Sequence, residues 1–286
     1  MNKQITLMLE KFGELSITDS KNALKEIIQE LSILALSRTD FFAHAAFYGG
    51  TALRIFHGID RFSEDMDFSL KFPNPDFNLQ SYLDKIEILL KSYEFEMSTE
   101  IKKKAVESTV KSAFLKGNTL IHLVKIRSIE PPISGVPNNE VLKIKLEVDT
   151  DPPAGAQYEQ KYRLQPEPYA ALLYDLPSLF SGKLHALLCR NWRSRVKGRD
   201  FYDYLWYLSQ NTSCEIAHLE QRMRQSDHWN EEKHLTREDI KRLLIERFSS
   251  TDFTQAKEDV IPFLQNPKKI DIWSKEFFIG ITNDYF

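Results

Sequence analysis

Residues 48–70, YGGTALRIFHGIDRFSEDMDFSL, constrain the fold more than any other part of the chain. Asp65 and Asp67 alternate with apolar residues at the period of a half-buried strand, so both carboxylates are expected on one face of one strand. Two carboxylates on a rigid strand suit a pair of Mg²⁺ ions about 3.5–4 Å apart, the arrangement used for in-line phosphoryl transfer. This stretch therefore predicts a strand that carries phosphoryl-transfer chemistry.

The segment before the two aspartates supplies further features of such a site. Gly49 and Gly50 allow a tight turn and a close backbone approach to phosphate, and the helix that they open presents free N–H groups to an anion. Arg61 and Ser63 lead into Asp65. By themselves, a Gly-Gly pair is usually a turn and an Asp-x-Asp is usually a solvated strand edge. Their combination in one segment is far more specific.

The rest of the chain predicts an α/β first half and a helical second half. Helical periodicity covers residues 20–37, with Asp19 or Ser20 as the cap, and 79–93. Strands are expected over 41–47, 94–102, around 106–114, over 118–129 and over 141–149. The Pro- and Gly-containing stretch DTDPPAGAQYEQ predicts a domain boundary, which gives domains 1–155 and 156–286. After it, 162–164 is expected to add one strand, and a helix is expected over 179–192 with Ser178 as its cap.

Charge, cysteine content and hydropathy argue against a protein that binds nucleic acid through its overall charge, a disulfide-bonded protein and a membrane-spanning protein. The chain has 38 basic and 41 acidic residues and a net charge of −3, so any nucleic-acid contact must rest on a local basic patch. Two cysteines, Cys189 and Cys214, lack metal-ligand spacing and predict reduced thiols in a cytoplasmic protein. No apolar run approaches the roughly 18 residues of a membrane span, so no membrane contact is expected.

A local basic patch does exist in RNWRSRVKGRDFYDYLWYL, residues 190–208. Arg193, Arg195 and Lys197 lie near Trp192, and cations interleaved with aromatics suit RNA phosphates and bases. A surface loop whose cations pair with neighbouring helices explains the same pattern equally well. From these residues both interpretations stay open; with the family resemblance given below, Arg193, Arg195 and Lys197 are expected to bind RNA.

The turn and the Asp-x-Asp resemble the signature of polymerase-beta-type nucleotidyltransferases. Within that superfamily the chain is most similar to the AbiEii/AbiGii (MenT-like) toxins of bacterial toxin–antitoxin systems. KLHALLCR at 183–190 and KGRDFYD at 197–203 match two further elements of these toxins. The resemblance implies a polymerase-beta-type domain with a small mixed sheet, helices on one face of it, and a helical C-terminal domain.

The resemblance also implies roles for individual residues. Lys183 would hold a nucleotide phosphate, and Asp200 would complete the active centre. A third carboxylate would come from a neighbouring strand, where VLKIKLEVD at 141–149 offers Glu147 first and Asp149 second; alone, that strand's charges would indicate only a solvated face. The expected metal ligands are therefore Asp65, Asp67 and Glu147, and the expected nucleotide contacts are Gly49, Gly50, Thr51, Arg61, Ser63 and Lys183. Whether Thr51 or Ser63 supplies the hydroxyl near the triphosphate stays open.

The function implied is a toxin that transfers a nucleoside monophosphate from an NTP to an acceptor hydroxyl. The ion would be Mg²⁺, with Mn²⁺ as an alternative, the acceptor a tRNA 3′ end, and a cognate antitoxin would be the protein partner. Transfer to a protein or to a small molecule is the alternative among enzymes. A non-catalytic nucleotide-binding module is the alternative of another class, although it would have no need for Asp65, Asp67, Lys183 and Asp200 together.

Overall fold

The computed structural model describes the chain except for residues 1–2, 14–15, 103–107, 128–132, 134 and 193–194. It divides into two compact units. The first unit comprises Met1–Gly58, Phe62–Pro152 and Glu159–Leu173. The second comprises Ile59–Arg61, Pro153–Tyr158 and Tyr174–Phe286. The chain therefore passes between the units several times.

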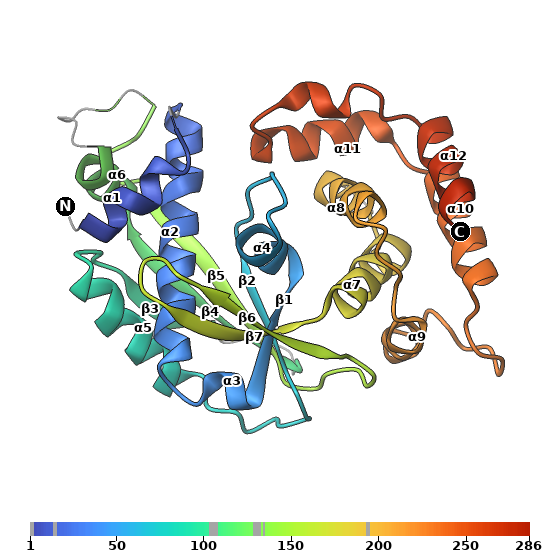
Figure 1. Ribbon diagram of the computed structural model, residues 1–286, viewed down its shortest axis with the longest axis horizontal. Coiled ribbons are helices and arrows are strands. Elements are labelled where there is room, and N and C mark those ends of the chain that lie inside the picture. The colour runs from blue at the N-terminus through green and yellow to red at the C-terminus, as the bar shows by residue number, and fades with distance from the viewer. Residues whose placement is uncertain (1–2, 14–15, 103–107, 128–132, 134, 193–194) are drawn as a thin grey trace. The chain divides into compact units, whose positions relative to one another are not determined.

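The first unit is built on a seven-stranded mixed sheet of order β3-β4-β5-β2-β1-β7-β6 (Figure 1). β1 is antiparallel to β2 and parallel to β7, β2 is parallel to β5, and β4 is antiparallel to β3 and β5. The strands are β1 (Ala45–Tyr48), β2 (Met66–Leu70), β3 (Ser98–Ile101), β4 (Val110–Asn118), β5 (Val141–Asp149), β6 (Tyr158–Arg163) and β7 (Tyr169–Tyr174).

Several helices accompany this sheet in the first unit. They are α1 (Lys3–Glu10), α2 (Ile17–Ser37), α3 (Phe41–His44), α4 (Gly49–Ala52), the π-helical turn η1 (Leu53–His57), α5 (Gln80–Ser92) and α6 (Thr119–Arg127). α2 packs against α5, α6 and β5 (Figure 1). Its buried Leu24, Ile27 and Leu31 recur at helical spacing, and burying each such side chain contributes roughly 1.5–3 kcal/mol. The expected mixed α/β fold is confirmed.

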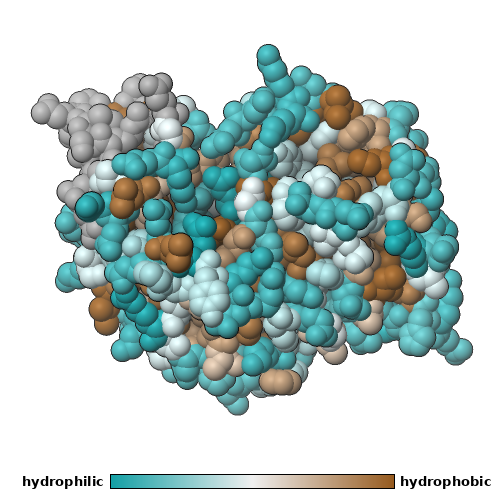
Figure 2. All heavy atoms as spheres, in the orientation of Figure 1, coloured by the Kyte–Doolittle hydropathy of each residue, from teal (hydrophilic) through white to brown (hydrophobic). Residues whose placement is uncertain are grey.

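The second unit is helical. Its elements are α7 (Leu176–Cys189), α8 (Gly198–Ser209), α9 (Ile216–Gln225), α10 (Arg237–Ser249), α11 (Phe253–Val260), the 3₁₀ turns η2 (Ile261–Phe263) and η3 (Pro267–Ile270), and α12 (Lys275–Tyr285). An aromatic cluster forms its core, in which Phe201 of α8 contacts Phe248, Phe253, Trp273 and Phe278. No helix in the described part of the chain is long and apolar enough to cross a membrane. On the face drawn in Figure 2, hydrophobic residues form separate groups in a mostly hydrophilic surface.

Some predicted elements differ from those observed. The strand expected over 41–47 begins only at Ala45, because Phe41–His44 forms α3. The expected strand at 118–129 is wrong within the described residues: Thr119–Arg127 is α6, and Asn118 Oδ1 accepts the Ile121 N–H at its start. α7 begins at Leu176, with Asp175 rather than Ser178 as the N-cap. β6 and β7 both follow residue 156, so the helical part starts later than expected.

Candidate active site

Parallel pairing of β2 with β5 brings predicted site carboxylates together. Asp67 is directly opposite Glu147, and Ser69 is opposite Asp149. Asp65 immediately precedes β2, and continuing the alternation of the strand by one residue would put it on the face of Asp67. All three of Asp65, Asp67 and Glu147 are half-buried. Because Asp149 is two positions further along β5, Glu147 is the better placed of the two candidates beside the Asp-x-Asp pair.

Glu147 already has polar partners. The Ser112 hydroxyl donates to Glu147 Oε1 at 2.8 Å, and Lys145 Nζ lies 2.7 Å from Oε2. Within the described ranges, no three carboxylate, His or Cys side chains stand close enough to hold a metal ion as they lie. Carboxylate oxygens are nevertheless the donors that Mg²⁺ prefers. The donor chemistry therefore fits Mg²⁺, and recruiting Glu147 would require it to release Lys145.

The Gly-Gly-Thr turn directly contacts β2 and Asp65, the residue before it; we call β2 the acidic strand. Gly49 has a φ of +82°, and a Cβ added there would stand 2.7 Å from Asp67 Oδ2. The buried Thr51 hydroxyl donates to the backbone carbonyl of Asp65. Thr51 thus holds the strand that carries the aspartates, whereas the Ser63 carbonyl accepts from Gln29 Nε2 at 3.2 Å. Gly49 is needed here for its left-handed backbone and for space beside Asp67.

The second unit contains a buried network of charges. Lys183 Nζ lies 2.7 Å from both Asp200 Oδ1 and Asp203 Oδ2. Arg61 donates through Nε and Nη2 to the two oxygens of Asp203, at 2.5 and 2.6 Å. Arg190 Nη1 donates to Asp200 Oδ2 at 2.5 Å. Three cations thus surround two carboxylates.

Burial makes this network sensitive to the loss of any member. The side chains of Asp203 and Arg61 are 0% and 2% exposed, and that of Lys183 is 13% exposed. Burial alone would raise the pKa of Asp203, but the charges of Arg61 and Lys183 outweigh it and hold that pKa below its ordinary value. Removing one partner from a buried ion pair costs about 3–5 kcal/mol. The guanidinium of Arg61, expected to contact nucleotide, is committed to Asp203 in this structure.

The predicted RNA-binding loop is only partly described. Arg193 lies outside the described residues. Arg195 pairs with the buried Asp259, and the Gly198 N–H donates to Asp259 Oδ2 at 2.9 Å. Lys197 is half-buried, and burial, followed by the charge of Arg195, lowers its pKa. Arg195 therefore has a carboxylate partner within its own unit.

Family membership follows from the comparison with known proteins. The family model "Nucleotidyl transferase AbiEii toxin, Type IV TA system" matches residues 32–277. The chain belongs to this family. The matched range includes both the acidic strand β2 and the Lys183–Asp200–Asp203 network. AbiEii membership makes the chain a nucleotidyltransferase of a type IV toxin–antitoxin family and confirms the family inferred from the motifs.

One solved structure has a fold similar to that of this AbiEii chain. JHP933 from Helicobacter pylori is 17% identical, with a TM-score of 0.50, over 95% of this chain and 91% of that chain. A second H. pylori structure, named only provisionally as a nucleotidyltransferase, is also 17% identical, with a TM-score of 0.46 over 91% of both chains. At this identity the first likeness concerns the fold alone. No curated protein shows significant similarity to the chain.

Sequence reasoning on this AbiEii chain missed the roles of Asp203 and Arg190. Asp203 follows Asp200 by three residues on α8, a spacing that puts both carboxylates on one helix face. That spacing was the available signal. Arg190 opens the basic stretch 190–208 and had no assigned role, and it pairs with Asp200. The pairing of Asp203 with Arg61 cannot be assigned from spacing, because the two residues are 142 positions apart in the sequence.

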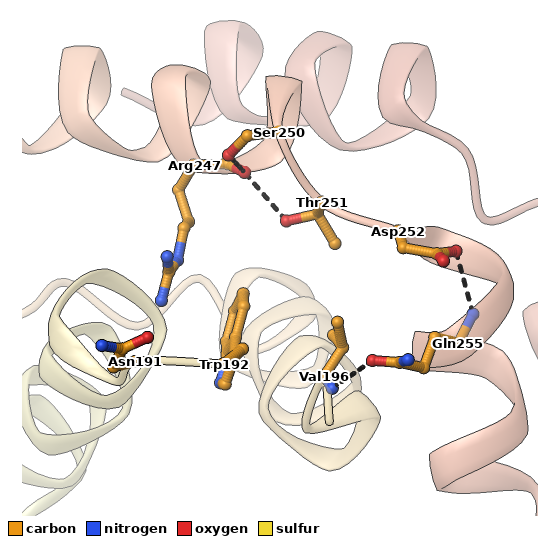
Figure 3. A pocket seen from close by; sticks show the side chains of 8 residues that line it. All are labelled: Asn191, Trp192, Val196, Arg247, Ser250, Thr251, Asp252 and Gln255. Atoms are coloured by element: carbon orange, nitrogen blue, oxygen red, sulfur yellow. Dashed lines mark hydrogen bonds between the residues drawn. The ribbon is translucent and has the colours of Figure 1, made fainter. Parts of the chain in front are cut away.

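One pocket of about 350 Å³ lies in the second unit of this AbiEii chain (Figure 3). The Arg247 guanidinium stacks over the Trp192 ring at 3.8 Å and donates to the Leu187 carbonyl at 2.7 Å. Arg247 is therefore already engaged by the protein. The lining residues are Asn191, Trp192, Val196, Arg247, Ser250, Thr251, Asp252 and Gln255. None of them is a predicted catalytic or metal-binding residue.

Proposed function

We propose that this AbiEii chain is a cytoplasmic toxin that transfers a nucleoside monophosphate from an NTP to the 3′ hydroxyl of tRNA. The observation that carries the proposal is the pairing of Asp67 with Glu147 across β2 and β5, beside the turn at Gly49. Family membership supports nucleotidyl transfer itself. A cognate antitoxin is the expected protein partner.

Asp65, Asp67 and Glu147 would hold Mg²⁺, or Mn²⁺ in its place. When bound, the ion would neutralise phosphate charge and orient the attacking hydroxyl. Glu147 would also bias that hydroxyl toward deprotonation. Gly49 and Gly50 would allow phosphate to approach the backbone, Thr51 would keep the aspartate strand in place, and Ser63 would offer a hydroxyl to the triphosphate.

Lys183 would contact a phosphate of the nucleotide, with Asp200 completing the charge balance. The contacts of Lys183 with Asp200 and Asp203 support a fixed position for its ammonium group. Preorganised charge of this kind stabilises charge that develops in a transition state, and removal of one such donor typically lowers the rate about 10²–10³-fold. Arg61 would act through Asp203 as a positioning residue.

The test is to incubate the purified protein with each labelled NTP, Mg²⁺, and either total RNA or total protein. We expect label in the tRNA fraction. Asp67→Ala and Glu147→Gln should reduce labelling by about 10²-fold or more, because each removes a carboxylate that would hold the metal ion against the phosphates. Asp149→Asn is the matched control on the same strand face and should retain labelling. Circular dichroism would establish that the variants are folded.

Label in the protein fraction would mean that the acceptor is a protein and not tRNA. Undiminished labelling by Asp67→Ala would mean that β2 is not part of the active site. If Asp149→Asn fails while Glu147→Gln works, Asp149 is the third carboxylate.

A further inference from the structure

The face of β4 and β5 that carries Glu147 also carries a group of lysines around one aromatic ring. Antiparallel pairing sets Ser112 opposite Glu147, Phe114 opposite Lys145, and Lys116 opposite Lys143. Paired residues of neighbouring strands share a sheet face. We call Phe114, Lys116, Lys143 and Lys145 the β4–β5 lysine strip. All of it belongs to the first unit, on the same face as the acidic residues.

The cations of this strip are unequally engaged. Lys145 pairs with Glu147, and Lys116 pairs with the exposed Glu100. Lys143 is exposed, and its ammonium lies 3.7 Å from the centre of the Phe114 ring. Among the described residues, Lys143 forms no ion pair, and the nearby Glu100, whose pKa is lowered mainly by Lys116 and also by the charge of Lys143, is already paired with Lys116. Lys143 is therefore the cation of the strip best able to meet an external anion.

The strip has the dimensions of a strand of nucleic acid rather than of a triphosphate. From Glu147, Lys145 is two residues away and Lys143 four, and at about 3.3 Å per residue Lys143 lies roughly 13 Å from the acidic end. Same-face residues on β5 thus recur at about the spacing of successive phosphates in an extended single strand. Single-strand binding sites combine such cations with aromatic rings on which bases stack. Phe114 supplies the ring.

We propose that the β4–β5 lysine strip binds the single-stranded end of the RNA acceptor and directs its terminal hydroxyl toward Asp67 and Glu147. The inference rests on the proposed function, since it assigns the surface on which the acceptor lies. Lys143 contacts a backbone phosphate, and Phe114 stacks with a base. Lys145 joins the phosphate contacts when Glu147 releases it. Arg195, paired with Asp259, is not required for this binding.

The experiment measures binding of a short fluorescein-labelled single-stranded RNA with a free 3′ hydroxyl to the full-length protein, by anisotropy across a salt series and without NTP. Lys143→Ala should lower the slope of log affinity against log salt by roughly 0.7, the value for one lost phosphate contact on a single strand. Adding Lys145→Ala should lower the slope by less than a second full contact, because Lys145 is paired with Glu147 in the absence of NTP. Lys85→Ala removes an exposed lysine from α5 and is the matched charge control, which should leave the slope unchanged.

Phe114→Leu separates stacking from charge. It should weaken RNA binding about five-fold or more, because base stacking on an aromatic ring contributes about 1–3 kcal/mol per base, and should leave the salt slope unchanged. An unchanged slope in Lys143→Ala overturns the proposal. So does a Lys143→Ala variant that loses affinity for NTP, measured by calorimetry, but keeps its affinity for RNA, because the strip would then seat the triphosphate.

Failure of this inference is distinguishable from failure of the proposed function. If the wild-type protein labels tRNA but the strip variants bind RNA normally, only the strip is wrong. If the wild type binds RNA through the strip but transfers no label, only the transferase proposal is wrong. If the wild type binds no RNA at all, the strip and the RNA acceptor are both wrong, whatever else becomes labelled.

Discussion

Gly198, in the sequence KGRDFYD, illustrates how a motif residue can serve packing. A Cβ at this position would stand 1.8 Å from the backbone oxygen of Ala256 in α11. No rotation of a side chain can relieve a clash with backbone, so α8 and α11 would have to separate. The Gly198 N–H bond to Asp259 would be strained by the same movement. The glycine thus lets α8 begin against α11, with Asp200 on its first turn.

Gly198→Ala should therefore lower the free energy of unfolding by about 3 kcal/mol or more, the upper range for overpacked sites. Gly182→Ala in α7 is the matched control, since its added methyl would stand in ordinary contact with Arg222 Cζ of α9, at 3.9 Å. That control should stabilise by roughly 0.5–1 kcal/mol, because alanine is the better helix former. Urea unfolding of both variants measures the difference. Equal stability of the two would contradict the close approach.

Individual helices and strands differ in how far local sequence determines them. The strand at 66–70 and the strand at 141–149 were predictable, because strict alternation and flanking turns leave one register that buries their apolar faces. Residues 119–127 were not, since LIHLVKI fits a strand or a buried helix equally well. As a helix, α6 contacts α1 and α2, and tertiary contacts of this kind override a weak local preference. The pairing of Asp67 with Glu147 could not be predicted either, because it depends on the order of the strands in the sheet, and the periodicity of one strand does not reveal that order.

The start of α10 was predictable from TRED at 236–239. Thr236 Oγ1 accepts the Asp239 N–H at 3.2 Å, and Asp239 in turn accepts the Thr236 N–H at 3.2 Å, which completes a capping box. Thr236→Ala should destabilise the protein by about 1 kcal/mol, the usual loss for an N-cap. Ser209→Ala, at an exposed hydroxyl near the end of α8, should change stability by less than about 0.5 kcal/mol. Thermal unfolding of the two variants tests the cap.

Stability of the entire chain should depend on pH through buried histidines in both units. Burial lowers the pKa of His57 in the first unit and of His218 in the second to about 4. The unfolded chain protonates these groups near pH 6.5, whereas the folded chain does not, so the free energy of unfolding falls as pH falls from about 6.5 to about 4. Carboxylates with lowered pKa, such as Asp203, lose their contribution only at lower pH.

When the pH falls from 7 to 5, we expect each of these two histidines to lower the free energy of unfolding by roughly 1–2 kcal/mol. His218→Gln should be less stable at pH 7, because the bond to the Ala154 carbonyl changes, but should lose less stability on going to pH 5. His44→Gln, at a side chain that is 54% exposed, is the control and should follow the wild type. Urea unfolding at a series of pH values gives the slope of the free energy of unfolding against pH for each variant and for the wild type. Parallel slopes for His218→Gln and wild type would count against a neutral buried imidazole.

The short segment Ile59–Arg61 bears on how such a protein can change during evolution. It lies between η1 and β2 in sequence, yet it belongs to the second unit, where Arg61 neutralises the buried Asp203. A gene fragment that encoded residues 156–286 alone would lack this arginine and would bury a carboxylate with one fewer countercharge. Recombination at the Pro-rich boundary would therefore separate a side chain from its partner, so the two units are expected to be inherited together rather than exchanged as independent modules.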